Sequence, residues 1–538
     1  MKRTLFTLAI FINAFAHAQV AYQNPVLPGF YSDPSICRVN DDYYMVHSSF
    51  GYFPGVPVFH SKNLVNWKQI GYVLTRREQV PLEKAGVTLG IFAPTIRYHQ
   101  GLFYMITTNI TAKGNFYVTA KDPAGEWSDP VWIDMPGIDP SFFFDEDGKV
   151  YVTSSVNWGP SQNKGIFLSQ IDLASGKLLT RPKNVWLGTG GRFPEGPHIY
   201  KKDGWYYLMI AEGGTEYGHK ETIARGQYVD GPYMGDPANP ILTHINHNAE
   251  TSPIQGVGHG DLVQTQDGSW FMVAHAFRPL KNHQILGRET FLAPVRWDKN
   301  AWPVVNGDGT ISFSMEASSL PSAVVPQTTA QHEQFNEDKL GMEWNYLNNP
   351  IEFNYSLSKR KGYFQLMGSD STLNQLPGVT FAGRRQQHFD FIATTQLDFD
   401  PKREGEEAGI TLFKDVSYHY DISVKYTGGQ RKLLLSYHLG RILHKEKEVV
   451  LKDGPVQLRI TGTQEYYVFE FSQDNHSYQK VGEVDTQFLS AEVAGGFTGV
   501  YIGLYATGNG RPSRTPADFD WFSYEPQLSD KPFSLTNK

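Results

Sequence analysis

The sequence contains a single cysteine, Cys37, so no disulfide bond can form within one chain. Beyond the N-terminal segment 1–18 it has no apolar run long enough to span a bilayer, and it has no block of basic residues typical of nucleic-acid surfaces. It also lacks the Gly-x-Ser-x-Gly pattern of serine hydrolases and the His-Glu-x-x-His pattern of zinc hydrolases. We therefore expect no nucleic-acid partner and no membrane anchor, and a fold stabilised by its core, with Cys37 buried in it.

The N-terminal segment, residues 1–18, differs from the rest of the chain. It has a basic start, an apolar run and a small-x-small ending, which is typical of a secretory signal peptide cleaved after Ala18. No cysteine follows this position, so a lipid anchor is not expected there. The segment predicts an exported protein, periplasmic or secreted.

The composition favours an all-β protein. Aromatic residues make up 14% of the chain, glycine (51) and proline (32) are plentiful, and turn signals recur about every ten residues. A length of 538 residues is too great for one ordinary core, which predicts two domains.

A sequence unit recurs five times in the N-terminal part of the chain. Each copy has a short apolar strand, a turn rich in Asp, Asn or Gly, and a second strand with an aromatic residue 11 or 12 positions after the first residue. A second hairpin often follows, which gives four strands in about 50–60 residues, the anatomy of a propeller blade. We therefore predict a five-bladed β-propeller over residues 22–315. The copies begin at Asp33, Ala93, Asp139, Glu195 and His259.

The first residues of these copies are expected to meet at one end of the propeller axis. An Asp before Pro is by itself usually a turn residue. Three carboxylates that share one axis, however, repel one another and raise each other's pKa, which is tolerated mainly at functional sites. Two uses remain open on these residues alone: acid–base hydrolysis of a glycosidic bond, or a calcium or magnesium site.

Several motifs resemble those of glycoside hydrolase family 43, and more narrowly its two-domain β-xylosidases and α-L-arabinofuranosidases. They occur in the family order and span nearly the whole mature chain. The resemblance implies an inverting enzyme that needs no cofactor for its chemistry. The matching stretches are PGFYSDPSIC, FAPTIRY, GIDPSFFFD, EGPHIYK, GHGDLV and LGRET.

Carried over by motif, the resemblance implies roles for the three carboxylates. Asp33 is expected to be the general base that activates water, and Glu195 the general acid. Asp139 is expected to orient Glu195 and to keep its pKa raised. This division agrees with the chemistry, because the acid must stay protonated near neutral pH and a nearby carboxylate favours that state.

The same resemblance suggests substrate-binding residues. His259 in GHGD and Arg288 in LGRET match an axial histidine and a substrate-binding arginine of the family. Phe92 stands where the family usually has tryptophan, and Phe53 is a second candidate wall of the sugar site.

The remainder of the chain predicts a second β domain. Residues 316–331 are predicted to be a linker, because the stretch ASSLPSAVVPQTTAQ within them is small, proline-containing and uncharged. Residues 332–527 alternate like the strands of a β-sandwich. This part resembles the C-terminal concanavalin-like sandwich of the same enzymes, whose loop closes the active site. Residues 506–518 are the candidate loop, and Glu333 with Asp520 are candidate ligands of a structural calcium ion.

The resemblance leads to a specific functional hypothesis. We expect an exo-acting enzyme that releases xylose, L-arabinofuranose or both from the non-reducing ends of small hemicellulose-derived oligosaccharides. The alternative is a non-catalytic carbohydrate-binding propeller, which would not need an acid, a base and a third carboxylate together. A fructan-cleaving enzyme would carry Asn-Asp-Pro-Asn-Gly in its first blade, and this phrase is missing.

Overall fold

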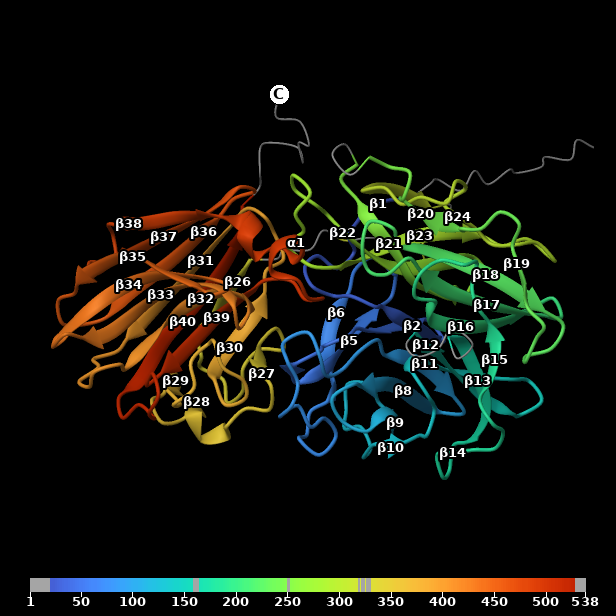
Figure 1. Cartoon of the computed structure of the whole chain (residues 1–538), viewed down its shortest axis with the longest axis horizontal. Coiled ribbons are helices and arrows are strands. Elements are labelled where there is room, and N and C mark those ends of the chain that lie inside the picture. The colour runs from blue at the N-terminus through green and yellow to red at the C-terminus, as the bar shows by residue number, and fades with distance from the viewer. Residues whose placement is uncertain are drawn as a thin grey trace, which may run out of the picture.

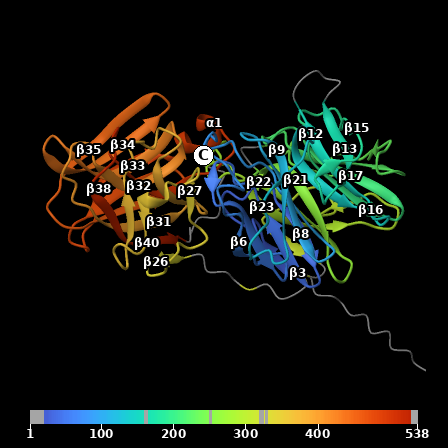
Figure 2. The same ribbon diagram turned by 90° about the horizontal axis from the view of Figure 1, so that it is seen from below.

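The computed structural model describes residues 20–157, 164–248, 252–317, 320, 325 and 330–527. The predicted signal peptide and most of the predicted linker therefore lie outside the described residues. The chain forms two β domains side by side, with the first domain in blue to yellow-green and the second in yellow to red (Figures 1 and 2). No helix in the described ranges is long and apolar enough to cross a membrane.

The first domain is a five-bladed propeller, as predicted. In each blade antiparallel strands follow one another outward from the axis. Blades 1 and 2 contain β2 (Ser35–Val39), β3 (Asp42–Val46), β5 (Gly55–Ser61) and β6 (Lys68–Leu74), then β7 (Thr95–His99), β8 (Leu102–Asn109), β9 (Gly114–Ala120) and β10 (Val131–Trp132). Blade 3 contains β11 (Ile138–Phe144), β12 (Val150–Val156), β13 (Gly165–Asp172), β14 (Lys177–Leu178) and β15 (Lys183–Trp186). Blades 4 and 5 contain β16 (Glu195–Lys202), β17 (Trp205–Glu212), β18 (Lys220–Gly226), β19 (Met234–Gly235) and β20 (Leu242–Thr243), then β21 (Gln255–Gln264), β22 (Trp270–Phe277), β23 (Glu289–Arg296) and β24 (Val304–Val305).

The five innermost strands close into a ring. Each of β2, β7, β11, β16 and β21 contacts the next one, and β21 returns to β2. Outside this ring, β1 (Val20–Gln23) pairs with β25 (Ser314–Ala317), which ties the start of the propeller to its end. The starts of the innermost strands therefore converge on one axis.

The hairpins within the blades follow from their turn residues. Gln100 and Gly101 both have positive φ, as do Asp203 and Gly204, which is the two-residue turn that fits the twist of an antiparallel hairpin. Hydrophobic residues of the paired strands then pack between neighbouring blades in four separate clusters. Cys37 is buried in the cluster between blades 1 and 2, as predicted.

The second domain is a sandwich of two eight-stranded sheets around one apolar core. One sheet contains β26 (Gln331–Glu333), β28 (Tyr355–Ser356), β29 (Phe364–Met367), β31 (Phe391–Asp398), β36 (Val456–Gly462), β37 (Tyr466–Ser472), β38 (Gln479–Asp485) and β40 (Pro516–Pro526). The other contains β27 (Asn345–Leu347), β30 (Thr380–Arg385), β32 (Glu407–Asp415), β33 (Tyr418–Thr427), β34 (Gln430–Leu439), β35 (Ile442–Val450) and β39 (Tyr501–Thr507), together with β4 (Tyr52–Phe53). The helical elements are short: η2 (Glu352–Asn354), η3 (Thr486–Leu489) and α1 (Ala491–Ala494).

Strand β4 joins the two domains, because it belongs to the propeller by sequence but pairs with β27 of the sandwich. Next to it, the ring of Tyr52 stacks on that of Tyr501, with 3.9 Å between the ring centroids. Buried Arg385 of β30 donates from Nε to the carbonyl of Phe30 (2.6 Å) and from Nη1 to Asn345 Oδ1 (2.8 Å). Strand pairing, ring stacking and buried hydrogen bonds therefore all cross the boundary between the two domains.

We expect the Arg385→Met variant to lose about 3 kcal/mol of its free energy of unfolding, because the buried Phe30 carbonyl loses a charged donor. Urea unfolding followed by tryptophan fluorescence measures this as a lower midpoint. Arg441→Met, at an exposed position, is the matched control. Equal midpoints for the two variants would show that Arg385 does not hold the domains together.

Candidate active site

The innermost strands present the candidate residues through an unusual backbone conformation. Asp33, Asp139 and His259 have φ of 54°, 53° and 51°, and Gly196 has φ of 56°. Residues other than glycine rarely adopt this left-handed region, and such strain concentrates at functional sites. The same local kink at the start of four blades turns these residues toward the axis.

The kink also shows that Glu195 is displaced by one residue from the repeat position predicted for it. In blade 3, Ile138 pairs just before the irregularity and Asp139 follows it. In blade 4, Glu195 pairs in the same way as Ile138, so Gly196 is the residue equivalent to Asp139. A Cβ on Gly196 would lie 2.9 Å from Nε2 of His259, so glycine leaves the room that the histidine needs.

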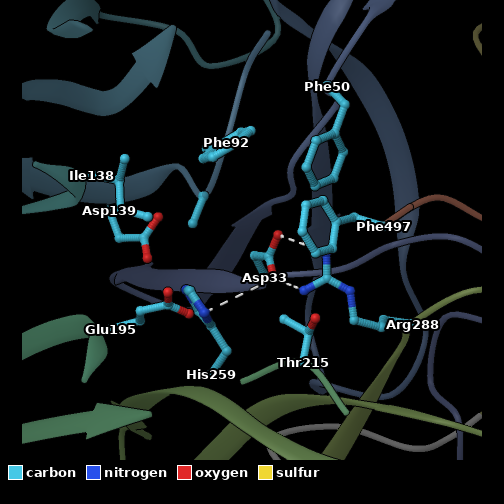
Figure 3. A pocket seen from close by; sticks show the side chains of 11 residues that line it. Asp33, Phe50, Phe92, Ile138, Asp139, Glu195, Thr215, His259, Arg288 and Phe497 are labelled. Atoms are coloured by element: carbon cyan, nitrogen blue, oxygen red, sulfur yellow. Dashed lines mark hydrogen bonds and ion pairs between the residues drawn. The ribbon is translucent and has the colours of Figure 1, made fainter. Parts of the chain in front are cut away.

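The candidate residues gather around one pocket of about 80 Å³ at this end of the axis (Figure 3). Of the predicted residues, the structure brings together the three carboxylates, the histidine, the arginine and Phe92. The complete lining is Asp33, Phe50, Phe92, Ala93, Ile138, Asp139, Glu195, Thr215, His259, Arg288 and Phe497.

Phe53 does not line this pocket, contrary to the sequence-based prediction. It lies in β4, where it pairs with Tyr346 of the second domain. Phe50, three residues earlier, supplies the wall instead, and its ring packs against that of Phe92 with 5.6 Å between centroids. Both phenylalanines lie in one aromatic stretch, and only the pairing with the second domain decides which of them faces the pocket.

Asp33 is held by hydrogen-bond donors on both of its oxygens. Oδ1 accepts from Arg288 Nη1 (2.6 Å) and lies 3.1 Å from Nδ1 of His275, while Oδ2 accepts from the hydroxyls of Ser48 and Ser32. Burial alone would raise the pKa of Asp33, but Arg288 and the neighbouring histidines hold this pKa well below its usual range. The carboxylate is therefore ionised at neutral pH.

Glu195 and Asp139 have the opposite electrostatic character. Burial and the charge of Asp33 raise the pKa of Glu195 to about 7, although Arg288 and a hydrogen bond from Asn157 (2.8 Å) oppose the shift. Burial and the Glu195 and Asp33 carboxylates raise the pKa of Asp139 well above its usual value. Near neutral pH this pair retains a proton that Asp33 does not hold, which is the asymmetry that acid–base catalysis requires.

The alternative use of these residues as a cation site is not favoured by their contacts. The guanidinium of Arg288 already forms an ion pair with Asp33 and supplies positive charge to this carboxylate. Within the described ranges, the ligand atoms of these carboxylates and of His259 form no cluster of three that lie within 4.8 Å of one another. The arrangement fits proton transfer.

The predicted calcium ligands also do not form such a cluster in the part of the chain that the structure describes. Glu333 accepts a hydrogen bond from the backbone of Phe335 (3.0 Å), and Asp520 accepts one from Gln396 (2.7 Å). The structure thus gives these two carboxylates local roles in the sandwich. The one cluster of this kind there is formed by His419, Asp421 and His438.

The second domain contributes to the pocket through Phe497, which sequence analysis missed. Its ring stacks against Phe50 (6.0 Å between centroids), and the guanidinium of Arg288 lies 5.8 Å from its centroid. The predicted closing loop, residues 506–518, is not part of the lining; it bonds within the sandwich, as from Ser513 N to the Gly368 carbonyl (2.7 Å). Residues 495–500, here called the covering segment, close the pocket in its place.

The covering segment is anchored to both domains. Val500 donates from its backbone N–H to the carbonyl of Ile285 in the propeller (3.1 Å). On the sandwich side, the buried Nζ of Lys414 in β32 donates to the carbonyl of Thr498, next to Phe497. Burial lowers the pKa of Lys414 to about 8, so this lysine carries its charge at neutral pH.

We expect Lys414→Met to raise KM roughly tenfold with little change in kcat, because losing a charged donor costs about 1.5 kcal/mol in the placement of Phe497. Steady-state kinetics on a small chromogenic glycoside measure this. Lys447→Met, at an exposed position, is the control. An unchanged KM would show that Lys414 does not position the covering segment.

Comparisons with known proteins agree with this architecture. The profile of glycosyl hydrolases family 43 matches residues 22–303, and that of the β-xylosidase C-terminal concanavalin A-like domain matches residues 332–525. The chain is 42% identical to a non-reducing end α-L-arabinofuranosidase of Bacteroides ovatus over 97% of this chain and 98% of that protein. It is 30% identical to a β-xylosidase of Bacillus subtilis over 93% of this chain and 99% of that protein.

Solved structures show the same likeness. A Bacteroides ovatus protein named Xyloglucan PUL GH43B has a TM-score of 0.90 at 42% identity, covering 94% of this chain and all of that one. The xylan β-1,4-xylosidase of Bacillus halodurans has a TM-score of 0.89 at 34% identity, covering 94% of this chain and 99% of that one. With both domains matched and the three carboxyl groups gathered in one pocket, the chain belongs to glycosyl hydrolases family 43 and is an inverting glycoside hydrolase.

Proposed function

We propose that this enzyme is exo-acting and releases L-arabinofuranose, xylose or both from the non-reducing ends of hemicellulose-derived oligosaccharides. The observation that carries the proposal is the pair of carboxyl groups in one small pocket: ionised Asp33, and Glu195 with a pKa raised to about 7. Burying a carboxyl group so that its pKa rises is unfavourable, and it serves a protein that must donate a proton. A non-catalytic sugar-binding propeller does not need such a group.

The chemistry follows from these protonation states. Glu195 donates its proton to the glycosidic oxygen as the bond to the anomeric carbon breaks. Asp33 takes a proton from the water whose oxygen forms the new bond to that carbon. Asp139 accepts a hydrogen bond from the N–H of Gly196 (3.4 Å) and thereby holds the backbone next to the acid. The pKa of Glu195 is raised by its burial and by the charge of Asp33, whereas the resemblance had implied Asp139 as the cause. No cofactor enters these steps.

The shape of the site supports exo action on a small sugar. The pocket encloses about 80 Å³, and Phe497 from the second domain closes it on one side. The wall that Phe497 adds to the propeller pocket supports binding of a chain end, which is the basis of the exo action proposed here. The names of the relatives support the two sugars, since they include a non-reducing end α-L-arabinofuranosidase and a β-xylosidase.

We expect wild-type enzyme to release p-nitrophenol from the α-L-arabinofuranoside, the β-D-xylopyranoside or both. In Glu195→Gln, kcat should fall by about 10²–10⁴ on a substrate with a poor leaving group, because no proton reaches the glycosidic oxygen. Glu78→Gln, at an exposed glutamate, should retain wild-type rates. Full activity of Glu195→Gln on natural oligosaccharides would remove the acid assignment.

The pH profile provides a separate test. Glu195 must be protonated to act, so kcat/KM should decline as the pH rises through about 7. Asp33 must be ionised, and its lowered pKa places the acidic limb below the usual range of an aspartate. A profile that stays flat up to pH 9 would contradict the raised pKa of Glu195.

We also propose that the protein is exported, on the basis of the signal-like sequence of residues 1–18. N-terminal sequencing of the protein recovered from the periplasm or the medium should begin at Gln19. Recovery of the chain in the cytoplasm with this N-terminal segment intact would contradict export.

A further inference from the structure

A buried histidine behind the pocket contacts the general base and has no role in the chemistry described so far. His275 lies in β22 and is fully buried. Its Nδ1 is 3.1 Å from Oδ1 of Asp33 and 3.2 Å from the backbone N of the same residue. Its Nε2 is buried and has no hydrogen-bond partner in the described part of the chain.

His275 is the middle ring of a stacked column of three histidines. Its ring centroid is 5.7 Å from that of His259 and 4.9 Å from that of His219. Burial and the charge of Arg288 lower the pKa of His275 to about 3, although Asp33 opposes this shift. The ring is therefore neutral at working pH and carries one proton.

One proton on the ring allows only one of the two contacts to Asp33 at a time. With the proton on Nδ1, His275 donates to the Asp33 carboxylate and leaves the Asp33 N–H without an acceptor. With the proton on Nε2, Nδ1 accepts from that N–H, and the buried Nε2–H is left without a partner. Each tautomer leaves one N–H unpaired, so the charge-assisted bond to an ionised carboxylate decides in favour of the Nδ1 proton.

We propose that His275 is a positioning residue for the reaction: its Nδ1–H donates to Oδ1 of Asp33 and fixes the orientation of the ionised base. The proposal rests on Asp33 being the base. Arg288 donates to the same oxygen but also faces the sugar pocket between Phe50 and Phe497, where it is available to substrate hydroxyls. His275 is fully buried, does not line the pocket, and contacts Asp33 from the interior of the blade.

The charged and titratable groups around this pair determine the expected pH effect. Asp33 faces Arg288, His259 and His275, and its charge acts on the two carboxyl groups Asp139 and Glu195. Around His275, the neighbours are Arg288, His259, His219 and Asp33. Replacing the neutral His275 ring leaves all these charges in place. A shift of the acidic limb of kcat/KM therefore reports the loss of the hydrogen bond to Asp33.

The experiment compares His275→Phe with His219→Phe in the full-length enzyme. Both variants replace a buried ring of the same column, but only His275 touches Asp33. In His275→Phe we expect kcat to fall about tenfold to a hundredfold and the acidic limb of kcat/KM to move up by about one pH unit, because Asp33 loses a donor to its ionised form. KM and the alkaline limb should stay close to wild type.

His275→Asn tests rescue, since its side-chain amide offers an N–H donor near the place of Nδ1. We expect the acidic limb of kcat/KM in His275→Asn to return toward its wild-type pH. An acidic limb in His275→Phe that matches that of His219→Phe would overturn the proposal. If His275→Phe does not fold, His275→Leu takes its place in the comparison with His219→Phe. In that case, equal acidic limbs of kcat/KM for His275→Asn and His275→Leu would also overturn the proposal.

A further variant separates this proposal from the assignment of the base itself. If Asp33→Asn keeps its activity, the proposed function of Asp33 fails, and the role of His275 fails with it. If Asp33→Asn abolishes hydrolysis while His275→Phe shows no shift, the base assignment stands and only the positioning role is overturned.

Discussion

The ion pair between Asp33 and Arg288 is the interaction on which the rest of the site depends. Three carboxyl groups share a buried axis, and only this pair gives one of them a cation at 2.6 Å. The charge of Asp33 is thereby stabilised, and the same charge raises the pKa of Glu195 and Asp139, which have no such partner. One salt bridge thus divides three similar groups into a base and a pair that keeps a proton.

The closed ring of innermost strands made much of this site predictable. A repeat of fixed spacing in the sequence becomes a set of residues at one axis, so Asp33, Asp139, Glu195 and His259 could be found without coordinates. The sequence did not reveal the one-residue displacement of Glu195. That displacement depends on which residue takes the left-handed conformation, and glycine takes it in blade 4.

The residues that sequence analysis missed act through contacts between distant segments. Phe497 and Lys414 belong to the second domain, and no local pattern distinguishes a phenylalanine that covers a pocket from one that fills a core. His275 was hidden for the same reason, because it lies in the middle of an ordinary strand of blade 5 and its partner Asp33 stands at the start of blade 1. Sequence analysis named Phe53 and missed Phe50, because the pairing of Phe53 with Tyr346 of the second domain is a tertiary contact.

The pairing of β4 with β27 has a consequence for the order in which the molecule can be completed. Phe53 precedes its partner Tyr346 by most of the propeller, since the rest of blade 1 and the other four blades lie between them in the chain. All the blade strands precede the sandwich in the chain, but β4 has no pairing partner until β27 of the sandwich is present. The covering segment that carries Phe497 arrives later still. The three carboxyl groups come from the propeller, but the pocket is complete only in a chain that extends through the covering segment.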